Sequence, residues 1–488
     1  MKTARITGRP GYRQRGSVST IYVSVLIPII GFVGLAIDLS FAYTRRTEMQ
    51  SVADAAAVAA ARALDGTMAG IEAAKTQART TAQRQKYSFG RAVVWVDDAL
   101  RFSDSPDKPD ADWLPAGSVN AANAANLYYA KVDTRALGDE HARVDVVFAQ
   151  FLGGARETMS MAARAIAGRT SIQVTPLAVC AITNTRVSTR DVDKGGSVVQ
   201  ELLHYGFRRG VSYNLLNMNP NGTSAVSYLV NPLDFPNQPE ELGHRSLAVV
   251  RPFVCSGSIA ASNLRAGSRL YVGNPFPATL TAELNSRFSN YTGSTCNRVP
   301  APPDRNIKAF NAWYFGWWMN SSGTINGSAE PREIGGAKLT IADQSAAIVG
   351  ITRTHYGPLW AFSKAVQYDA GAPDGVGAPF LLADWPYLYP VGSGVPLQAS
   401  YDDALASPYN AHVAPHRANP PVTGMAQRRV LNIPLLECPV SGSTARVLAI
   451  GRFFMGSQAD AGTPPSVHGE FGGLVADNQL GATVGLYK

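Results

Sequence analysis

The chain has 488 residues, of which 45% are hydrophobic and 16% charged, and its net charge is +8. Five cations stand before any acid, and without them the net charge falls to +3: Lys2, Arg5, Arg9, Arg13 and Arg15. The excess charge is therefore a feature of the N-terminus, and it gives no support for a nucleic-acid-binding face. The length predicts two or three domains, and 45 Gly and 31 Pro predict many turns and β-rich structure.

The first predicted element is a membrane-spanning helix over residues 16–43. Residues 16–37 contain no charged side chain, and these 22 residues reach roughly 33 Å as a helix, enough to cross a hydrocarbon core of about 30 Å. Residues 1–15 then form a cytoplasmic basic tail, and everything after Tyr43 is exported. A cleaved signal peptide is the alternative, but its apolar core is usually about 7–15 residues, and Arg45 and Arg46 intervene here. We therefore favour a retained anchor.

Several residues of this span are of interest. Ser17 stands at its start, and Pro28 is expected to bend the helix. Gly31 and Gly34 are three residues apart, which falls short of the Gly-x-x-x-Gly packing motif. Asp38 closes the apolar run, where it could lie among lipid headgroups or face a cation of a neighbouring subunit.

An Ala-rich helical extension is predicted over residues 44–86. Eight of the eleven residues from Ala53 to Ala63 are alanine, the best helix former, so the membrane helix should continue without a break. Gly66 and Gly70 are the points at which an interruption would fall. A small apolar face repeats at helical spacing: Met49, Val52, Ala56, Ala59 and Ala63. This face suits close packing against another helix, and a solvated helix is the equal alternative.

These segments resemble a known family. Arg-Gly at 15–16, Gly-Leu-Ala-Ile-Asp-Leu at 34–39 and Met-Gln-Ser-Val-Ala-Asp-Ala-Ala-Ala-Val at 49–58 are similar to the N-terminal module of the tight-adherence (Flp) pilus-assembly proteins, in particular the TadG-like branch. The resemblance is close over about the first 65 residues and looser to about residue 170. It implies an inner-membrane component of pilus assembly, whose partners are the lipid bilayer, other pilus-assembly membrane proteins and pilin subunits.

Two departures from the family refine this expectation. Minor pseudopilins of the same system carry a glutamate five residues after the glycine at which the prepilin peptidase cuts, whereas here Ile21 stands five residues after Gly16. This favours a component that stays in the membrane. Many TadG-like proteins also carry a von Willebrand A domain with an Asp-x-Ser-x-Ser metal site. The nearest matches, at Asp38 and Asp343, lack the second serine, so no such site is expected.

Residues 87–170 are predicted to be a small pilin-like strand region, because a few strands follow a long helix. The expected strands are Ala92–Val96, Leu127–Asp133, Ala142–Phe151 and Thr158–Ile166. The acidic loop that contains Asp104 and Asp110 also contains Pro106, Pro109 and Pro115, so a solvated loop is favoured over a calcium site.

Residues 171–488 are predicted to form one or two mostly β domains. The expected strands are Ile172–Ile182, Ser224–Val230, Leu247–Cys255, Arg269–Val272, Ala309–Trp318, Ala346–Ile351, Arg429–Leu436 and Ala445–Met455.

All four cysteines lie in this exported region, as expected for two disulfides. Four cysteines allow three connectivities. We favour Cys255–Cys296 and Cys180–Cys438, because the second pair would tie the beginning of the domain to its end.

Motifs of enzymatic chemistry are weak. His412 and His416 have a metal-ligand spacing, but Pro415 makes this a loop, and surface histidines are favoured. The run that starts at Asp191 imitates a calcium loop but has Leu202 where the bidentate glutamate belongs, so a turn is expected. The aromatic cluster 313–319 is expected to be core rather than a binding patch. The sequence predicts no cofactor, no metal and no enzyme.

The predicted fold is thus α+β: a transmembrane helix continues into a long Ala-rich helix with a small pilin-like β region, and a mostly β exported domain follows. The favoured function is that of a non-enzymatic, single-pass protein of the bacterial inner membrane, with a cytoplasmic N-terminus and a periplasmic or extracellular C-terminal region. The alternative is an exported ligand-binding protein or enzyme that uses the same anchor, which would require a polar constellation in the C-terminal region.

Overall fold

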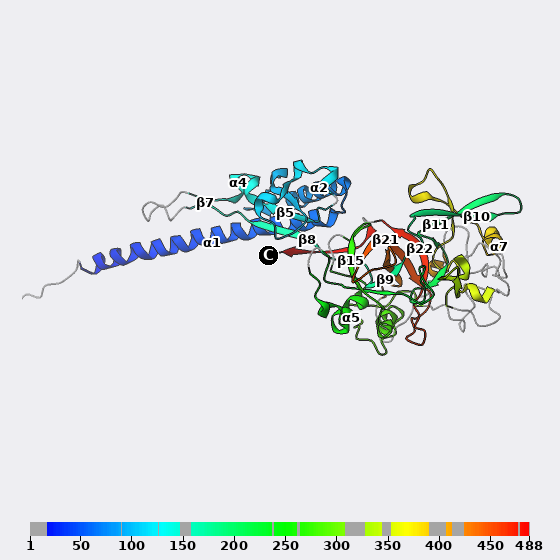
Figure 1. The fold of residues 1–488 in the computed structure, drawn as a ribbon. Helices are drawn as coiled ribbons and strands as arrows, with labels where there is room; N and C mark the ends of the chain where they lie inside the picture. Colours follow the sequence, from blue (N-terminus) through cyan, green and yellow to red (C-terminus); the bar gives the residue numbers. More distant parts are fainter. Residues whose placement is uncertain are drawn as a thin grey trace, which may run out of the picture. The chain divides into compact units, whose positions relative to one another are not determined.

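A computed structural model describes residues 17–88, 90–124, 126–146, 158–236, 239–260, 264–307, 327–343, 353–389, 407–411, 424–476 and 479–487. The chain forms two compact units. The first comprises Met1–Arg169 together with Val484–Lys488, and the second comprises Thr170–Thr483. The fold is α+β, with an N-terminal apolar helix followed by a mostly β region, as the sequence predicts (Figure 1).

The first unit is built on two helices. Helix α1 (Ser17–Ala63) contains both the apolar run and most of the alanines, and α2 (Met68–Arg84) follows after a short break. Gly66 adopts φ +84°, which permits the sharp turn, and the Thr67 hydroxyl accepts a hydrogen bond from the backbone N–H of Gly70 at 3.0 Å and so caps α2. The interruption therefore falls at Gly66, while Gly70 lies inside α2.

An antiparallel sheet completes the first unit. Its strand order is β23-β8-β5-β3-β4, and the C-terminal strand returns to it. The strands are β3 (Leu100–Ser103), β4 (Leu114–Pro115), β5 (Tyr129–Asp133), β8 (Arg164–Ile172) and β23 (Ala482–Tyr487). Smaller elements are the pairs β1 (Lys86–Tyr87) with β2 (Arg91–Ala92) and β6 (Arg143–Asp145) with β7 (Thr158–Ser160), and the short helices α3 (Ala121–Ala124) and α4 (Asp139–Ala142).

A closed ring of strand pairings forms the centre of the second unit. Strands β21, β15, β14, β9 and β20 are neighbours in that order, and β20 pairs again with β21. Their bounds are β9 (Leu177–Cys180), β14 (Tyr228–Val230), β15 (Arg269–Gly273), β20 (Val430–Leu436) and β21 (Thr444–Met455). Only β9 and β20 among them run parallel. Strands β22 (His468–Val475) and β13 (Ser212–Asn214) extend the sheet beyond β21.

A second sheet in this unit is formed by β10 (Val187–Asp193), β11 (Val198–His204), β12 (Phe207–Arg208), β18 (Val366–Tyr368) and β19 (Val376–Pro379). Strands β16 (Pro331–Ile334) and β17 (Ala337–Thr340) form a separate hairpin, and the helices are α5 (Leu247–Ser256), α6 (Thr281–Leu284), α7 (Trp385–Leu388) and α8 (Pro408–Ala411). The largest apolar core lies between these elements and includes the mutually packed rings of Phe207, Phe453 and Phe471. This core is large enough to hold the unit without the anchor helix.

The segment Leu247–Cys255 corrects one strand prediction, because it forms helix α5. Its buried residues include Val250 and Val254, four apart, which is a helical period. Gly257 in the left-handed region, at φ +75°, ends the helix. The composition of these nine residues is compatible with a helix or a strand. The C-cap at Gly257 favours the helix.

Other strand predictions are only partly right. Of Ala92–Val96 only Ala92 lies in a strand, and Thr158–Ile166 is divided between β7 and β8. The turn expected after Asp191 is the turn of the β10–β11 hairpin, where the Asp193 carboxylate accepts a hydrogen bond from the Gly196 N–H at 2.7 Å. The strands predicted at Ala309–Trp318 and Ala346–Ile351 lie outside the described residues.

Candidate functional site

Helix α1 begins with an exposed apolar surface. Tyr22, Ile27 and Phe32 are 73%, 67% and 74% exposed, and Ile21–Ala63 is long and apolar enough to contain a membrane span. Exposure of a contiguous apolar surface to water is unfavourable, so this part of α1 is a site that lipid or another protein covers. Pro28 lies inside this part of α1, and Ser17 is its first residue.

One face of the same helix is covered by the chain itself. Gly34, Asp38 and Ala42 are buried and Gly31 is half-buried, at the i, i+3 and i+4 spacing of a single stripe. Asp38 is only 3% exposed and interacts with another group of the chain.

The contacts that follow the span fix α1 to its own unit. Arg45 donates a hydrogen bond to the backbone carbonyl of His141 at 3.1 Å, pairs with Glu48 at 3.3 Å, and lies 4.9 Å from the ring centroid of Tyr87. The side chain of His141 is fully buried. Hence the helix is held rigidly from the point where it would leave a membrane.

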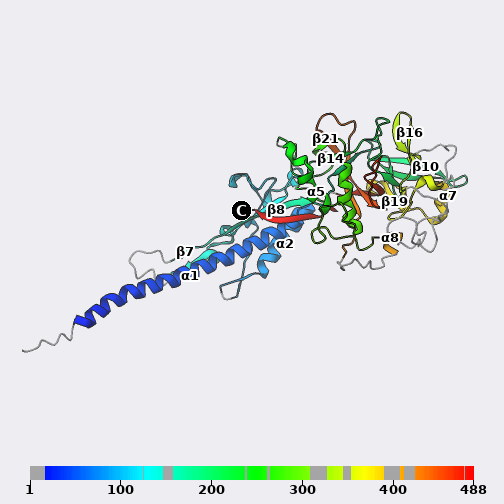
Figure 2. The same ribbon diagram turned by 90° about the horizontal axis from the view of Figure 1, so that it is seen from below.

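The small-residue face of α1 packs against helix α2 of the same chain. Of the predicted residues, Met49, Val52 and Ala56 are fully buried, whereas Ala59 and Ala63 are half-buried. The buried stripe also contains Ala53, Ala57, Ala60, Ala61 and Leu64. On α2 the facing residues are small as well: Gly70, Ala74, Ala78 and Ala82, with Ile71. Small side chains on both helices let the two backbones approach closely (Figures 1 and 2).

Both expected disulfides are present in the second unit. Cys180 at the end of β9 is bonded to Cys438 just after β20, with Cα atoms 5.6 Å apart. Cys255 in the last turn of α5 is bonded to Cys296, with Cα atoms 5.5 Å apart. The first links two neighbouring strands of the ring, and the second fixes the C-terminal end of α5.

Buried carboxylates of the second unit hold the fold together. Glu201 is fully buried between Arg190 and Arg208, each 2.9 Å away. Glu470 accepts hydrogen bonds from the backbone N–H groups of Ala361, Phe362 and Ser363 at 2.6, 2.9 and 2.7 Å, and burial raises its pKa to about 7. These acids are occupied by structural contacts.

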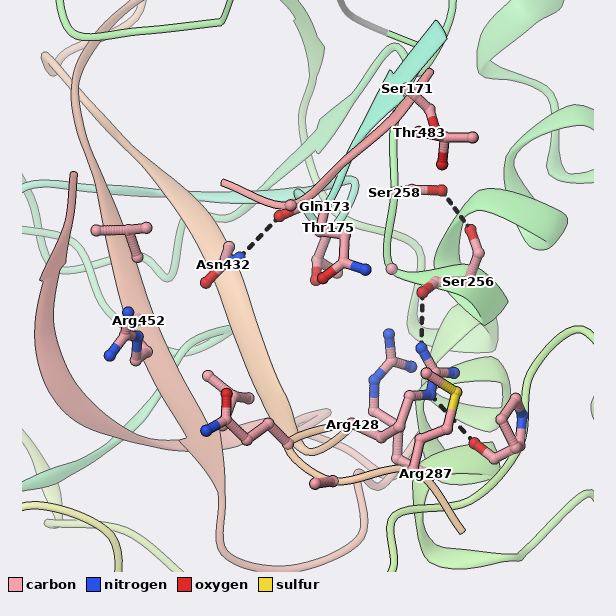
Figure 3. A pocket seen from close by; sticks show the side chains of 18 of the residues that line it. Ser171, Gln173, Thr175, Ser256, Ser258, Arg287, Arg428, Asn432, Arg452 and Thr483 are labelled. Carbon is pink, nitrogen blue, oxygen red and sulfur yellow. Dashed lines mark hydrogen bonds between the residues drawn. The ribbon is translucent and has the colours of Figure 1, made fainter. Parts of the chain in front are cut away.

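A polar pocket of about 380 Å³ lies in the second unit. Its walls come from the end of β8 and the residues after it, the C-terminal end of α5, and the strands β20 and β21 with the residues before β20 (Figure 3). The turn that contains Arg287, the loop with Pro300 and Pro302, and the segment from Val475 to Thr483 complete them. Arg287, Arg428 and Arg452 line it together with hydroxyl and amide side chains. Among the described residues that line the pocket there is no Asp, Glu or His. A general base for catalysis is thus not among the described lining groups.

The arginines of this pocket were not among the residues predicted from the sequence. They lie far apart along the chain, and only the fold brings them together. The Arg428–Arg429 pair directly before β20 was the one local signal, since charged residues seldom begin a buried strand.

The acidic loop of the first unit differs from a calcium site, because Asp110 pairs with Lys131 at 3.1 Å and with Arg164 at 3.0 Å. His412, His416, the cluster 313–319, Gly16 and the basic tail lie outside the described residues.

Helix α1 contains a candidate membrane span and continues into a packed α+β unit, an arrangement consistent with a single-pass membrane anchor. Residues 16–63 match the family described as putative Flp pilus-assembly TadE/G-like. The chain thus carries a TadE/G-like Flp pilus-assembly domain, which ends at Ala63, the last residue of α1. Neither a curated protein nor a solved structure matches the chain.

Proposed function

We propose that this protein is a non-enzymatic, membrane-anchored component of Flp pilus assembly. The observation that carries the proposal is the coincidence of the family match, residues 16–63, with one continuous helix, Ser17–Ala63. The helix has two parts with different surroundings: an exposed apolar part suited to lipid, and a part buried in the chain's own unit. The module therefore joins a membrane anchor rigidly to the folded region that it carries.

The orientation follows from charge. Five cations precede the apolar run and no acid accompanies them, so the positive-inside rule favours a cytoplasmic N-terminus. The rest of the chain would then lie in the periplasm or beyond. Two disulfides in the second unit support an oxidising compartment.

Partner binding is assigned to the outward face of α1. The inward face is occupied by α2 and the sheet, so a partner helix cannot use Ala56 without unpacking the unit. Thr47 and Ser51 are exposed on the same helix and lie within the matched region. They present a surface of small polar side chains to other pilus-assembly membrane proteins or pilin subunits.

The runner-up function, an exported enzyme or binding protein, has support from one observation only. The pocket of the second unit is polar, but its described lining offers arginine, hydroxyl and amide groups without a general base. This composition favours binding over catalysis.

Deletion of the gene tests the proposal. The expected result is loss of sheared surface pilin, restored by the full chain but not by a variant in which a cleavable signal peptide replaces residues 1–43. This variant keeps all of the second unit, Thr170–Thr483, and removes the anchor together with the buried residues Gly34, Asp38 and Ala42 of the first unit. Unchanged pilin on the surface of the deletion strain would contradict the proposed function.

A further inference from the structure

The pocket of the second unit contains a buried positive charge with too few partners. Arg287, in the 3-10 turn Asn285–Phe288, is 1% exposed. Its Nη2 donates to the backbone carbonyl of Val254 at 3.1 Å. Its Nε and Nη1 are buried and have no hydrogen-bond partner among the residues that the structure describes. Burial, with the nearby charge of Arg428, lowers the pKa of the Arg287 guanidinium well below its usual range.

Arg428 adds a second cation beside the first. It donates to the backbone carbonyls of Pro302, Ser256 and Cys255 at 3.1, 2.7 and 2.7 Å. These acceptors are neutral, so they satisfy the N–H groups without cancelling the charge. Figure 3 shows the bond from Arg428 to Ser256 at the end of α5.

The alternative is that both arginines have only a structural role and stabilise the C-terminal end of α5. The carbonyl end of a helix carries only about half a negative charge, whereas two guanidinium groups carry two positive charges. The helix end therefore accounts for the contacts of Arg428 but offsets only part of the positive charge. Asp304 also attracts Arg428, but its carboxylate accepts hydrogen bonds from the backbone N–H of Arg429 and the hydroxyl of Tyr409. It also leaves two buried nitrogens of Arg287, which carry three N–H groups, without a hydrogen-bond partner among the described residues, and this is costly in a folded protein.

Gly257 allows this arrangement. It ends α5 in the left-handed region, and a Cβ atom there would lie 2.8 Å from Nη2 of Arg287. Arg452 stands on β21, on another wall of the pocket, and its side chain makes no hydrogen bond or ion pair with the described residues. The pocket thus offers guanidinium donors from two sides.

We propose that this pocket binds a small polyhydroxy molecule that carries a phosphate or carboxylate group. Arg287 and Arg428 hold the oxyanion, because planar guanidinium groups match oxyanions with paired hydrogen bonds. Hydroxyl and amide groups of Thr175, Gln173 and Asn432 contact the rest of the ligand.

Size and lining favour this ligand over a bare ion. The volume of about 380 Å³ is at the lower end of small-molecule sites and exceeds by roughly tenfold the volume of about 30 Å³ that one water occupies. No aromatic side chain is among the described lining residues, so a stacking ligand has little to bind. A molecule of about monosaccharide size with one acidic group fits both facts. This site goes beyond the pilus role and does not depend on it.

Titration calorimetry on the full, oxidised chain in detergent at low salt tests the proposal. The probes are glucose 6-phosphate, glucuronate, inorganic phosphate and, as a neutral control, glucose. We expect heat from at least one of the two sugar acids and none from glucose, and the comparison of phosphate with carboxylate identifies the acidic group. The absence of binding by every acidic probe at about 10 mM, a concentration that fills a site with a Kd of 1 mM, would overturn the proposal.

Two substitutions with a matched control assign the site. Arg287→Met should weaken binding at least tenfold without lowering the thermal midpoint, because it removes an unpaired buried charge. Arg452→Gln should weaken binding several-fold, whereas Arg446→Gln, on the same strand at a side chain that is 57% exposed, should leave it unchanged. A lowered midpoint with unchanged binding in Arg287→Met would show a structural role instead.

One further variant addresses an acid that is close to the lining residues in the sequence. Asp477 lies outside the described residues and stands in the sequence between the lining residues Val475 and Gln479. If its carboxylate already neutralised the arginines, Asp477→Asn would bind the acidic probes and the wild type would not. That result would overturn the proposal, and equal binding by both proteins would support it.

Discussion

Cys180 and Cys438 join the ends of two neighbouring parallel strands, although 258 residues separate them in the sequence. Leu436, two residues before Cys438, is in register with Cys180. The bond therefore fixes covalently the parallel contact of the ring, between its first strand, β9, and β20.

The first prediction concerns this bond. The Cys180→Ser/Cys438→Ser double variant should lose about 2–4 kcal/mol in the free energy of unfolding, because the unfolded chain gains freedom when the long loop is opened. Denaturant titration of both proteins measures the change. Quantitative thiol labelling of all four cysteines in unreduced, freshly unfolded wild type would rule out both disulfides.

A second prediction concerns the packing of α1 on α2. Ala74→Leu should destabilise the first unit by about 1–3 kcal/mol, because Ala74 is fully buried against α1 and the larger side chain overpacks the contact. Ala73→Leu is the matched control, since Ala73 is exposed on the same turn and should change stability by less than about 0.5 kcal/mol. Equal tolerance of both changes, measured by denaturation, would mean that the two helices do not pack in this way.

Helix α1 and the disulfide pairing could be predicted from the sequence. The charge-free run and the alanines predicted α1, and the placement of the cysteines in two strand-like segments predicted their pairing. The identity of the buried face was only partly predictable, because eight alanines in eleven residues make every face of the helix look alike. Ala60 and Ala61 are buried while Ala59 and Ala63 are half-buried, because the positions of α2 and the sheet decide which side of α1 is covered.

The pocket shows where sequence reasoning ends. Arg287, Arg428 and Arg452 are separated by up to 165 residues, and no local pattern distinguishes Arg287 from a surface arginine. The strand prediction for Leu247–Cys255 was wrong for a different reason. A short apolar run does not by itself distinguish a helix from a strand, and the C-cap at Gly257 favoured the helix more than the β-branched residues favoured a strand.

A third prediction concerns pH. Burial lowers the pKa of His204 to about 4 from its ordinary value of about 6.5. Between about pH 6.5 and pH 4, His204 is protonated in the unfolded chain but remains neutral in the folded chain. The contribution of neutral His204 to the free energy of unfolding is therefore fully present above about pH 6.5 and is lost as the pH falls toward 4. Between about pH 7 and pH 5 the wild type should lose roughly 2 kcal/mol more than His204→Gln does.

Denaturant titrations of the two proteins at both pH values measure this difference. His468 and Glu470 also titrate in this range, but they are common to both proteins and cancel in the comparison. Parallel losses in wild type and variant would show that His204 does not carry the effect.

A fourth prediction concerns topology. A periplasm-type reporter fused after residue 170, at the boundary between the two units, should be active, because the N-terminal cations hold the preceding end in the cytoplasm. Alkaline phosphatase and β-galactosidase fusions at this position provide the measurement. Activity of the cytoplasmic reporter there would reverse the orientation.

In-cell photo-crosslinking tests the central claim, that the matched module attaches this protein to the pilus machinery. A photoreactive residue is placed at Ser51, exposed on α1 within residues 16–63, and for comparison at Val198, which is 62% exposed in the second unit. The account predicts that in pilus-producing cells Ser51 yields crosslinks to other pilus-assembly membrane proteins or pilin subunits, and that these crosslinks disappear in cells without the pilus system. Crosslinks to pilus proteins from Val198 alone, with normal protein level and membrane location, would contradict the claim.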